Sequence, residues 1–167
     1  MNSARLLVVS VAIAALAGAF MYVAQRFNLV SWVSFICWAG YFLAGGVPKE
    51  GGRMFVNWLF GIGIGAAIMV FAGAMDGIVS AEFTYPVALF VVIVPVLMLE
   101  NAPFLNMIPF MFFGAISLFA LGKPVEIETF KILVTAGFLG TALGWVTVTM
   151  RATITQFLTR NDPVEGA

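Results

Sequence analysis

Six long apolar segments, separated by short polar ones, constrain this chain more than any other feature. They cover residues 6–25, 29–45, 54–75, 83–99, 104–121 and 132–150. A helix of about 20 apolar residues, rising about 1.5 Å per residue, crosses the bilayer's hydrocarbon core of about 30 Å. The segments therefore predict an all-α polytopic membrane protein with about six transmembrane helices. They form one transmembrane domain at residues 1–152, followed by a polar tail at 153–167.

The composition supports this interpretation. Hydrophobic residues make up 62% of the chain, charged residues only 10%, and the mean hydropathy is +1.07. A soluble domain needs about 25% charged residues. Eight basic residues balance eight acidic ones, which argues against a nucleic-acid partner. With no histidine and a lone Cys37 inside an apolar segment, we expect no metal, no cofactor and no enzyme activity.

The chain also carries a pattern that recurs at an offset of 76 positions, between residues 42–66 and 118–142. The matched pairs are Ala44/Ala120, Gly46/Gly122, Pro48/Pro124, Glu50/Glu126, Gly61/Gly137 and Ala66/Ala142. Because three apolar segments separate equivalent positions, the second copy is expected to be upside down in the bilayer. This predicts a 3+3 inverted repeat with halves at 1–78 and 79–152. The alternative is chance, because Gly and Ala are abundant and only six of 25 paired positions agree.

Most charged residues fall in predicted loops at 47–53, 76–82 and 122–131, where residues 48–52 are expected to form a turn. Six spans place both termini on one side. That side would hold Arg5, Lys49, Arg53, Arg151 and Arg160, and the other side Arg26, Lys123 and Lys131. Because cytoplasmic loops are enriched in Lys and Arg, both termini and the tail are predicted to be cytoplasmic.

Two stripes of small or polar residues follow the third and sixth segments. Asn57, Gly61 and Gly65 form one, and Gly137, Thr141 and Gly144 form the other. One interpretation is helix packing, because small residues let helices approach closely in lipid. The other is that these residues line or tighten a narrow solute path on the pseudo-two-fold axis between the halves.

Three prolines and three polar side chains interrupt the apolar stretch at residues 95–110. They are Pro95, Pro103, Pro109, Glu100, Asn101 and Asn106. Prolines remove backbone donors, and non-helical backbone at membrane depth needs protein or a watery cavity around it. One interpretation is a constriction where the three polar side chains supply hydrogen bonds and Phe104 and Phe110 form apolar walls. The other places Glu100 at a loop end in water.

Five short motifs between residues 31 and 115 resemble those of a known family, and the resemblance covers nearly the whole chain. They are Ser31-Trp32-Val33-Ser34-Phe35, Tyr41-Phe42, residues 48–52 before a glycine-rich helix, Ile108-Pro109-Phe110 and Phe113-Gly114-Ala115. Together they resemble the YcdZ-like small bacterial inner-membrane proteins, a domain family of unknown function. The resemblance implies a bacterial inner-membrane location and no enzyme activity. Residues 106–113 also resemble, more weakly, the Pro-Phe loop of one half of a urea transporter. Here Ile108 replaces the Thr of that loop, and the Gln-bearing first-helix motif is absent.

These observations predict a homo-oligomeric channel or facilitator in the lipid bilayer for a small, largely uncharged solute such as urea, an amide or ammonia. Scarce intramembrane charge argues against strong ion coupling. One alternative is a proton- or cation-coupled transporter that uses Glu100 as proton carrier. Another is a membrane interaction or assembly protein that transports nothing and uses its small-residue stripes to hold partners.

The distribution of Lys and Arg generates a prediction for orientation. A reporter that is active only in the cytoplasm should be active when fused after Ala167, and inactive when fused after Lys123 in the opposite loop. A periplasm-specific reporter should give the reverse pattern. Periplasmic activity after Ala167 would contradict the predicted orientation.

Overall fold

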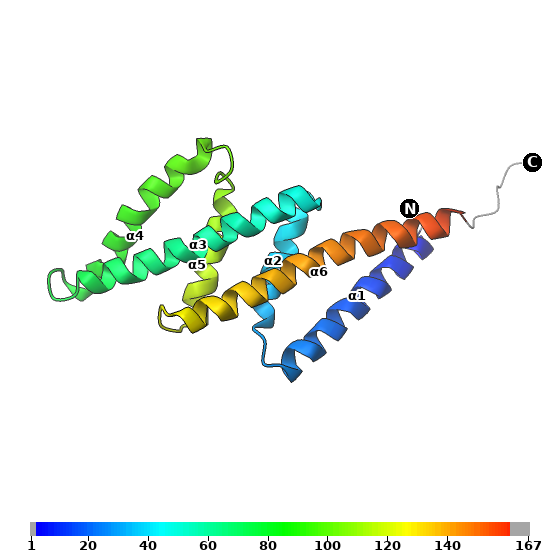
Figure 1. The fold of residues 1–167 in the computed structure, drawn as a ribbon, viewed down its shortest axis with the longest axis horizontal. Helices are drawn as coiled ribbons and strands as arrows, with labels where there is room; N and C mark the ends of the chain where they lie inside the picture. The colour runs from blue at the N-terminus through cyan, green and yellow to red at the C-terminus, as the bar shows by residue number, and fades with distance from the viewer. Residues whose placement is uncertain (1–2, 161–167) are drawn as a thin grey trace, which may run out of the picture.

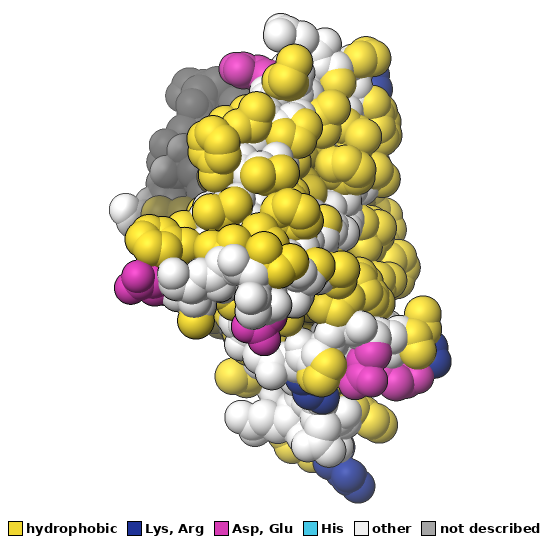
Figure 2. All heavy atoms as spheres, turned by 90° about the vertical axis from the view of Figure 1, so that its left-hand side faces the viewer, with side chains coloured by type: hydrophobic (Ala, Val, Ile, Leu, Met, Phe, Trp, Pro, Cys, Tyr) yellow, Lys and Arg dark blue, Asp and Glu magenta, His cyan; other side chains and the backbone are white. Residues whose placement is uncertain are grey.

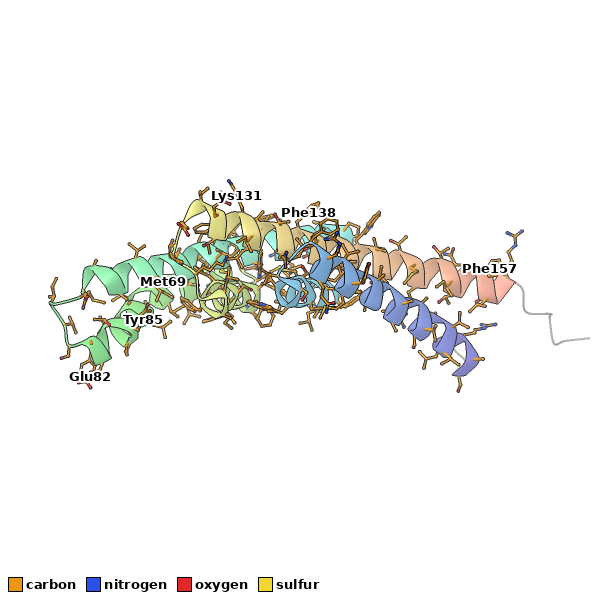
Figure 3. All side chains as sticks on the ribbon, turned by 90° about the horizontal axis from the view of Figure 1, so that it is seen from below. Met69, Glu82, Tyr85, Lys131, Phe138 and Phe157 are labelled. Carbon is orange, nitrogen blue, oxygen red and sulfur yellow. The ribbon has the colours of Figure 1, made fainter. Side chains whose placement is uncertain are left out.

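The computed structural model describes residues 3–160. This part of the chain forms six α-helices and a short 3-10 helix, without β-strands, which confirms the all-α prediction. The elements are α1 (Ser3–Arg26), α2 (Ser31–Leu43), α3 (Pro48–Ala74), α4 (Ala81–Leu97), η1 (Met98–Asn101), α5 (Ile108–Leu121) and α6 (Ile127–Arg160). Seen from below in Figure 3, Glu82 and Phe157 mark opposite ends of an elongated molecule.

Within residues 3–160, four helices, rather than the predicted six, are long and apolar enough to cross a membrane. They are α1, α3, α4 together with η1, and α6. Helices α2 and α5 have 13 and 14 residues and therefore rise only about 20 Å, less than the hydrocarbon core. Gly45 and Gly46, with φ of 99° and 69°, end the apolar run after α2. The run before α5 is irregular up to Met107, and Pro109 lies in the first turn of that helix.

The long helices begin earlier than the sequence indicates. The predicted turn at residues 48–52 is wrong, because these residues form the start of α3. Pro48 has a fixed φ that suits the first helical turn, and Glu50 places negative charge at the helix N-terminus. Helix α6 starts inside the predicted loop at 122–131 and continues through Arg160, into the predicted tail. The rest of that tail, residues 161–167, lies outside the described range.

Each short helix packs against the long helix of the other half, so the two short helices are exchanged between the halves. Short helix α5 lies against α3 of the first half, whereas short helix α2 lies against α6 of the second. The outer helices follow the same rule, because α4 packs on α3 and α1 packs on α6. Figure 1 shows helices α1–α3 and helices α4–α6 in opposite orientations. Helix α1 lies beside α6 at one end of the molecule, and α4 lies beside α3 at the other. A 3+3 inverted repeat predicts this reciprocal arrangement.

Two backbone contacts hold the exchanged helices together. A Cβ atom added to Gly61 of α3 would lie 2.0 Å from the carbonyl oxygen of Met111 in α5. One added to Gly140 of α6 would lie 2.0 Å from the carbonyl oxygen of Ser34 in α2. Ser34 and Met111 are each the fourth residue of their helix, and Gly61 and Gly140 are each the fourteenth. The structure therefore pairs Gly61 with Gly140, not with Gly137.

The outer surface is strongly apolar. Figure 2 shows hydrophobic side chains covering much of one face, mainly its upper part, with most of the visible acidic and basic side chains in its lower part. Leu7 of α1 is 64% exposed and Phe90 of α4 is 71% exposed. A soluble monomer rarely exposes an apolar area of this extent. Together with the four long apolar helices, this surface identifies a membrane-embedded protein.

The close contact at Gly61 predicts a stability effect for the smallest added side chain. Gly61→Ala should reduce the free energy of unfolding by roughly 1 to 3 kcal/mol, because the helices must move apart. Gly140→Ala should cost a similar amount. The control is Gly73→Ala, also in α3, where an added Cβ meets nothing within 4 Å. Thermal unfolding in detergent would measure all three, and a Gly61→Ala protein as stable as the control would contradict the packing role.

Candidate functional site

A polar cluster lies where the start of α3 meets the irregular segment 102–107 between η1 and α5. Glu50, Arg53 and Asn57 lie three and four positions apart along α3, so they share one face of the helix. The facing segment is not helical, because Pro103 and Pro109 lack backbone donors and disfavour helical geometry in the residues before them. The exposed backbone groups of this segment therefore require partners from elsewhere.

Asn57 supplies two of these partners. Its side chain is fully buried, at 0% exposure. The Asn57 Nδ2 donates to the carbonyl oxygen of Phe104 at 3.1 Å and to that of Arg53 at 2.8 Å. Its Oδ1 accepts from the backbone N–H of Met107 at 3.1 Å. One amide thus binds both a donor and an acceptor of the segment and fixes the entry into α5.

Arg53 binds the same segment from the side. Its Nε donates to the carbonyl oxygen of Phe104 at 3.3 Å, and its Nη2 donates to that of Pro103 at 3.4 Å and to Oδ1 of Asn106. Its Nη1 lies 3.3 Å from Oε2 of Glu50, and the two side chains are 23% and 31% exposed. The positive charge of Arg53 is therefore balanced by the adjacent carboxylate, and the cluster is neutral as a whole.

The structure brings together only some of the residues predicted for the polar constriction. Asn57 and Asn106 meet through Arg53, whereas Glu100 and Asn101 are exposed on η1. The Phe104 ring is 51% exposed, and Phe110 is buried and packs edge-on against Phe113. Sequence reasoning placed Arg53 and Glu50 in a loop and so missed their role. Their spacing of three residues was the available signal, because it predicts an ion pair once residues 48–53 are read as helix.

The glycines of the two stripes lie at helix contacts. An added Cβ at Gly65 would be 3.1 Å from Cα of Ala115, and one at Gly137 would be 2.4 Å from the Trp58 ring. With the Gly61 contact, these distances match the packing interpretation of the stripes. Thr141 donates to the carbonyl oxygen of Gly137 at 2.9 Å. Thr141 also borders a groove of about 340 Å³ between the start of α3 and the middle of α6.

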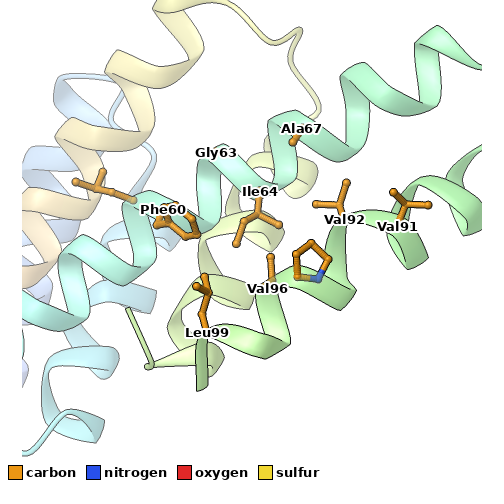
Figure 4. A pocket seen from close by; sticks show the side chains of 10 residues that line it. Phe60, Gly63, Ile64, Ala67, Val91, Val92, Val96 and Leu99 are labelled. Carbon is orange, nitrogen blue, oxygen red and sulfur yellow. The ribbon is translucent and has the colours of Figure 1, made fainter. Parts of the chain in front are cut away.

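A larger groove, of about 690 Å³, separates α3 from α4. Figure 4 shows Phe60 and Ile64 of α3 facing Val92 and Val96 of α4 across it. Every residue that lines this groove is apolar or glycine. Such a lining offers no hydrogen bond to a polar solute and suits contact with lipid tails.

Most of the chain matches one protein family. Residues 10–154 match DUF1097, described as a protein of unknown function. The chain belongs to the DUF1097 family. No curated protein and no solved structure matches the chain. Membership of DUF1097 bears out the expected uncharacterised domain family, whereas the YcdZ-like and urea-transporter likenesses stay resemblances carried by their motifs alone.

The hydrogen bonds of Asn57 predict how the DUF1097 domain responds to its loss. Asn57→Leu keeps the side-chain volume but leaves the Met107 N–H without its partner and Phe104 O with Arg53 Nε as its remaining donor. Each buried group left unsatisfied should reduce the free energy of unfolding by about 1 to 3 kcal/mol. Asn101→Leu, at an exposed position, is the control and should change it by less than about 0.5 kcal/mol. Equal melting temperatures for the two variants would refute the anchoring role.

Proposed function

We propose that this DUF1097 protein is a homo-oligomeric channel or facilitator in the bacterial inner membrane for a small, largely uncharged solute. The observation that carries the proposal is the irregular segment at residues 102–107, whose backbone groups and Asn106 side chain bind Arg53 and Asn57 of the other half. In transport proteins built from inverted repeats, solutes bind at the repeat interface, where helices are interrupted and backbone groups are available. The short helix α5 begins at such an interruption.

The chemistry of the cluster favours an uncharged solute. The charge of Arg53 is paired with Glu50, and the other polar groups are the amides of Asn57 and Asn106 and backbone carbonyls. These groups exchange hydrogen bonds with a neutral amide, urea or ammonia. An ion would lose its hydration without gaining an unpaired opposite charge, which is costly in a membrane.

The alternative function is assembly of membrane partners without transport. Gly61, Gly65 and Gly137 meet residues of this same chain, which argues both against a solute path along the stripes and against their use to hold partners, so assembly would have to use another surface. Coupled transport through Glu100 is less favoured, because this carboxylate is exposed on η1 and lies outside the cluster around Arg53.

Solute flux into liposomes tests the proposal. With purified protein, urea or acetamide uptake should exceed that of empty liposomes and should not depend on a pH gradient. Asn106→Ala should reduce uptake at least about tenfold, equivalent to about 1.4 kcal/mol of lost stabilisation, while Asn101→Ala and Glu100→Gln leave it unchanged. Uptake that requires a pH gradient and is lost in Glu100→Gln would replace the proposal with coupled transport. No protein-dependent uptake of either solute would leave the assembly function.

A further inference from the structure

The groove of about 340 Å³ that Thr141 borders is lined in part by a tyrosine whose hydroxyl group is buried. Tyr41 of α2 forms part of its lining, together with Gly52 at the start of α3 and Thr141, Phe138 and Trp145 of α6. Tyr41 is only 2% exposed. Its hydroxyl has no hydrogen-bond partner among the described residues. A buried polar group without a partner is unfavourable and calls for an explanation.

The position of the Tyr41 ring is tightly fixed. It lies between two glycines, because a Cβ atom at Gly51 would be 2.2 Å from its Cε2 and one at Gly144 would be 2.5 Å from its Cβ. The Cζ atom, which carries the hydroxyl, would be 3.2 Å from the added Cβ at Gly51. Gly51 adjoins Gly52, which lines the groove, so the hydroxyl end of the ring lies at the α3 side of this groove.

The other walls of the groove are loosely held. Phe138 and Trp145 are 61% and 52% exposed, and apart from the edge-on contact of Phe138 with Phe55 a change of rotamer costs them little packing. Figure 3 shows Phe138 at the outer side of α6. Beside Gly52 there is open space, since an added Cβ there meets nothing within 4 Å. Thr141 already donates its hydroxyl hydrogen to Gly137 O, which leaves its oxygen free to accept.

We propose that this groove binds a small neutral molecule with an apolar body and an amide group. The Tyr41 hydroxyl donates to the amide carbonyl, the Thr141 oxygen accepts from the amide N–H, and the aromatic rings of Phe138 and Trp145 cover the apolar part. The volume lies near the lower end of the range for small-molecule pockets, which excludes a bulky ligand. This inference rests on the proposed function, for which the groove is a solute-binding site.

Binding of butyramide to the purified protein tests the inference, with tryptophan fluorescence as readout because Trp145 borders the groove. The wild type should bind saturably. Tyr41→Phe keeps the ring and removes the hydroxyl, so its affinity should fall at least about tenfold, or about 1.4 kcal/mol. Gly52→Leu fills the groove and should abolish binding. Gly73→Leu, at another open glycine of α3, is the matched control and should bind as the wild type does.

Melting temperatures separate a lost ligand from a lost fold. Tyr41→Phe should melt at or above the wild-type temperature, because it removes a buried group without a partner. Equal affinity of Tyr41→Phe and wild type, or no saturable binding by the wild type, would overturn the inference. Butyramide binding without liposome uptake of urea or acetamide would keep the groove and remove the channel. Uptake without butyramide binding would remove the groove and keep the channel.

Discussion

Backbone-to-backbone contact between a long and a short helix is the interaction on which the rest of the structure depends. At Gly61 and Met111, and again at Gly140 and Ser34, no side chain separates the helices. Lipid tails provide no hydrophobic drive for helix association, so dispersion contacts and hydrogen bonds must supply it. The Ser34 hydroxyl adds a bond of 2.8 Å to Ala136 O at one crossing. These crossings join the halves, and the outer helices α1 and α4 then pack onto the long helices that the crossings have positioned.

The second requirement comes from the short helices. Because α5 does not fill the thickness of the bilayer, the chain before it must run as irregular backbone, whose polar groups need partners. Asn57 and Arg53 provide them from α3, the helix that α5 also crosses. The same pair of helices therefore carries both the apolar contact at Gly61 and the polar contact at Asn57, four residues earlier. One face of α3 thus provides both the close helix contact and the hydrogen bonds to the irregular backbone before α5.

The sequence was sufficient for the helical class and the membrane setting. The inverted repeat stays a prediction, and the two halves differ in register beyond one pair of matched glycines. Gly46 and Gly122 match in sequence and both adopt positive φ, at 69° and 64°, because each follows a short helix. Beyond them the halves diverge. Helix α3 begins two residues after Gly46, whereas α6 begins five residues after Gly122. The three extra residues before α6 move the contact from Gly137 to Gly140. Because glycine is abundant in the chain, the sequence match of Gly61 with Gly137 did not reveal this shift. The role of Arg53 was missed for a related reason, since Pro48 was read as a turn and not as the first residue of a helix.

Helix α6 has a mechanical consequence that follows from its length. Its 34 residues extend for about 51 Å, well beyond the roughly 30 Å of hydrocarbon. Hydroxyls of Thr153 and Thr159 bond to carbonyls of the preceding turn, within the helix itself. The close contact of Gly140 with Ser34 lies well before the C-terminal end of this helix. Any tilt of α6 about that contact would therefore displace Arg160 more than the residues next to the contact.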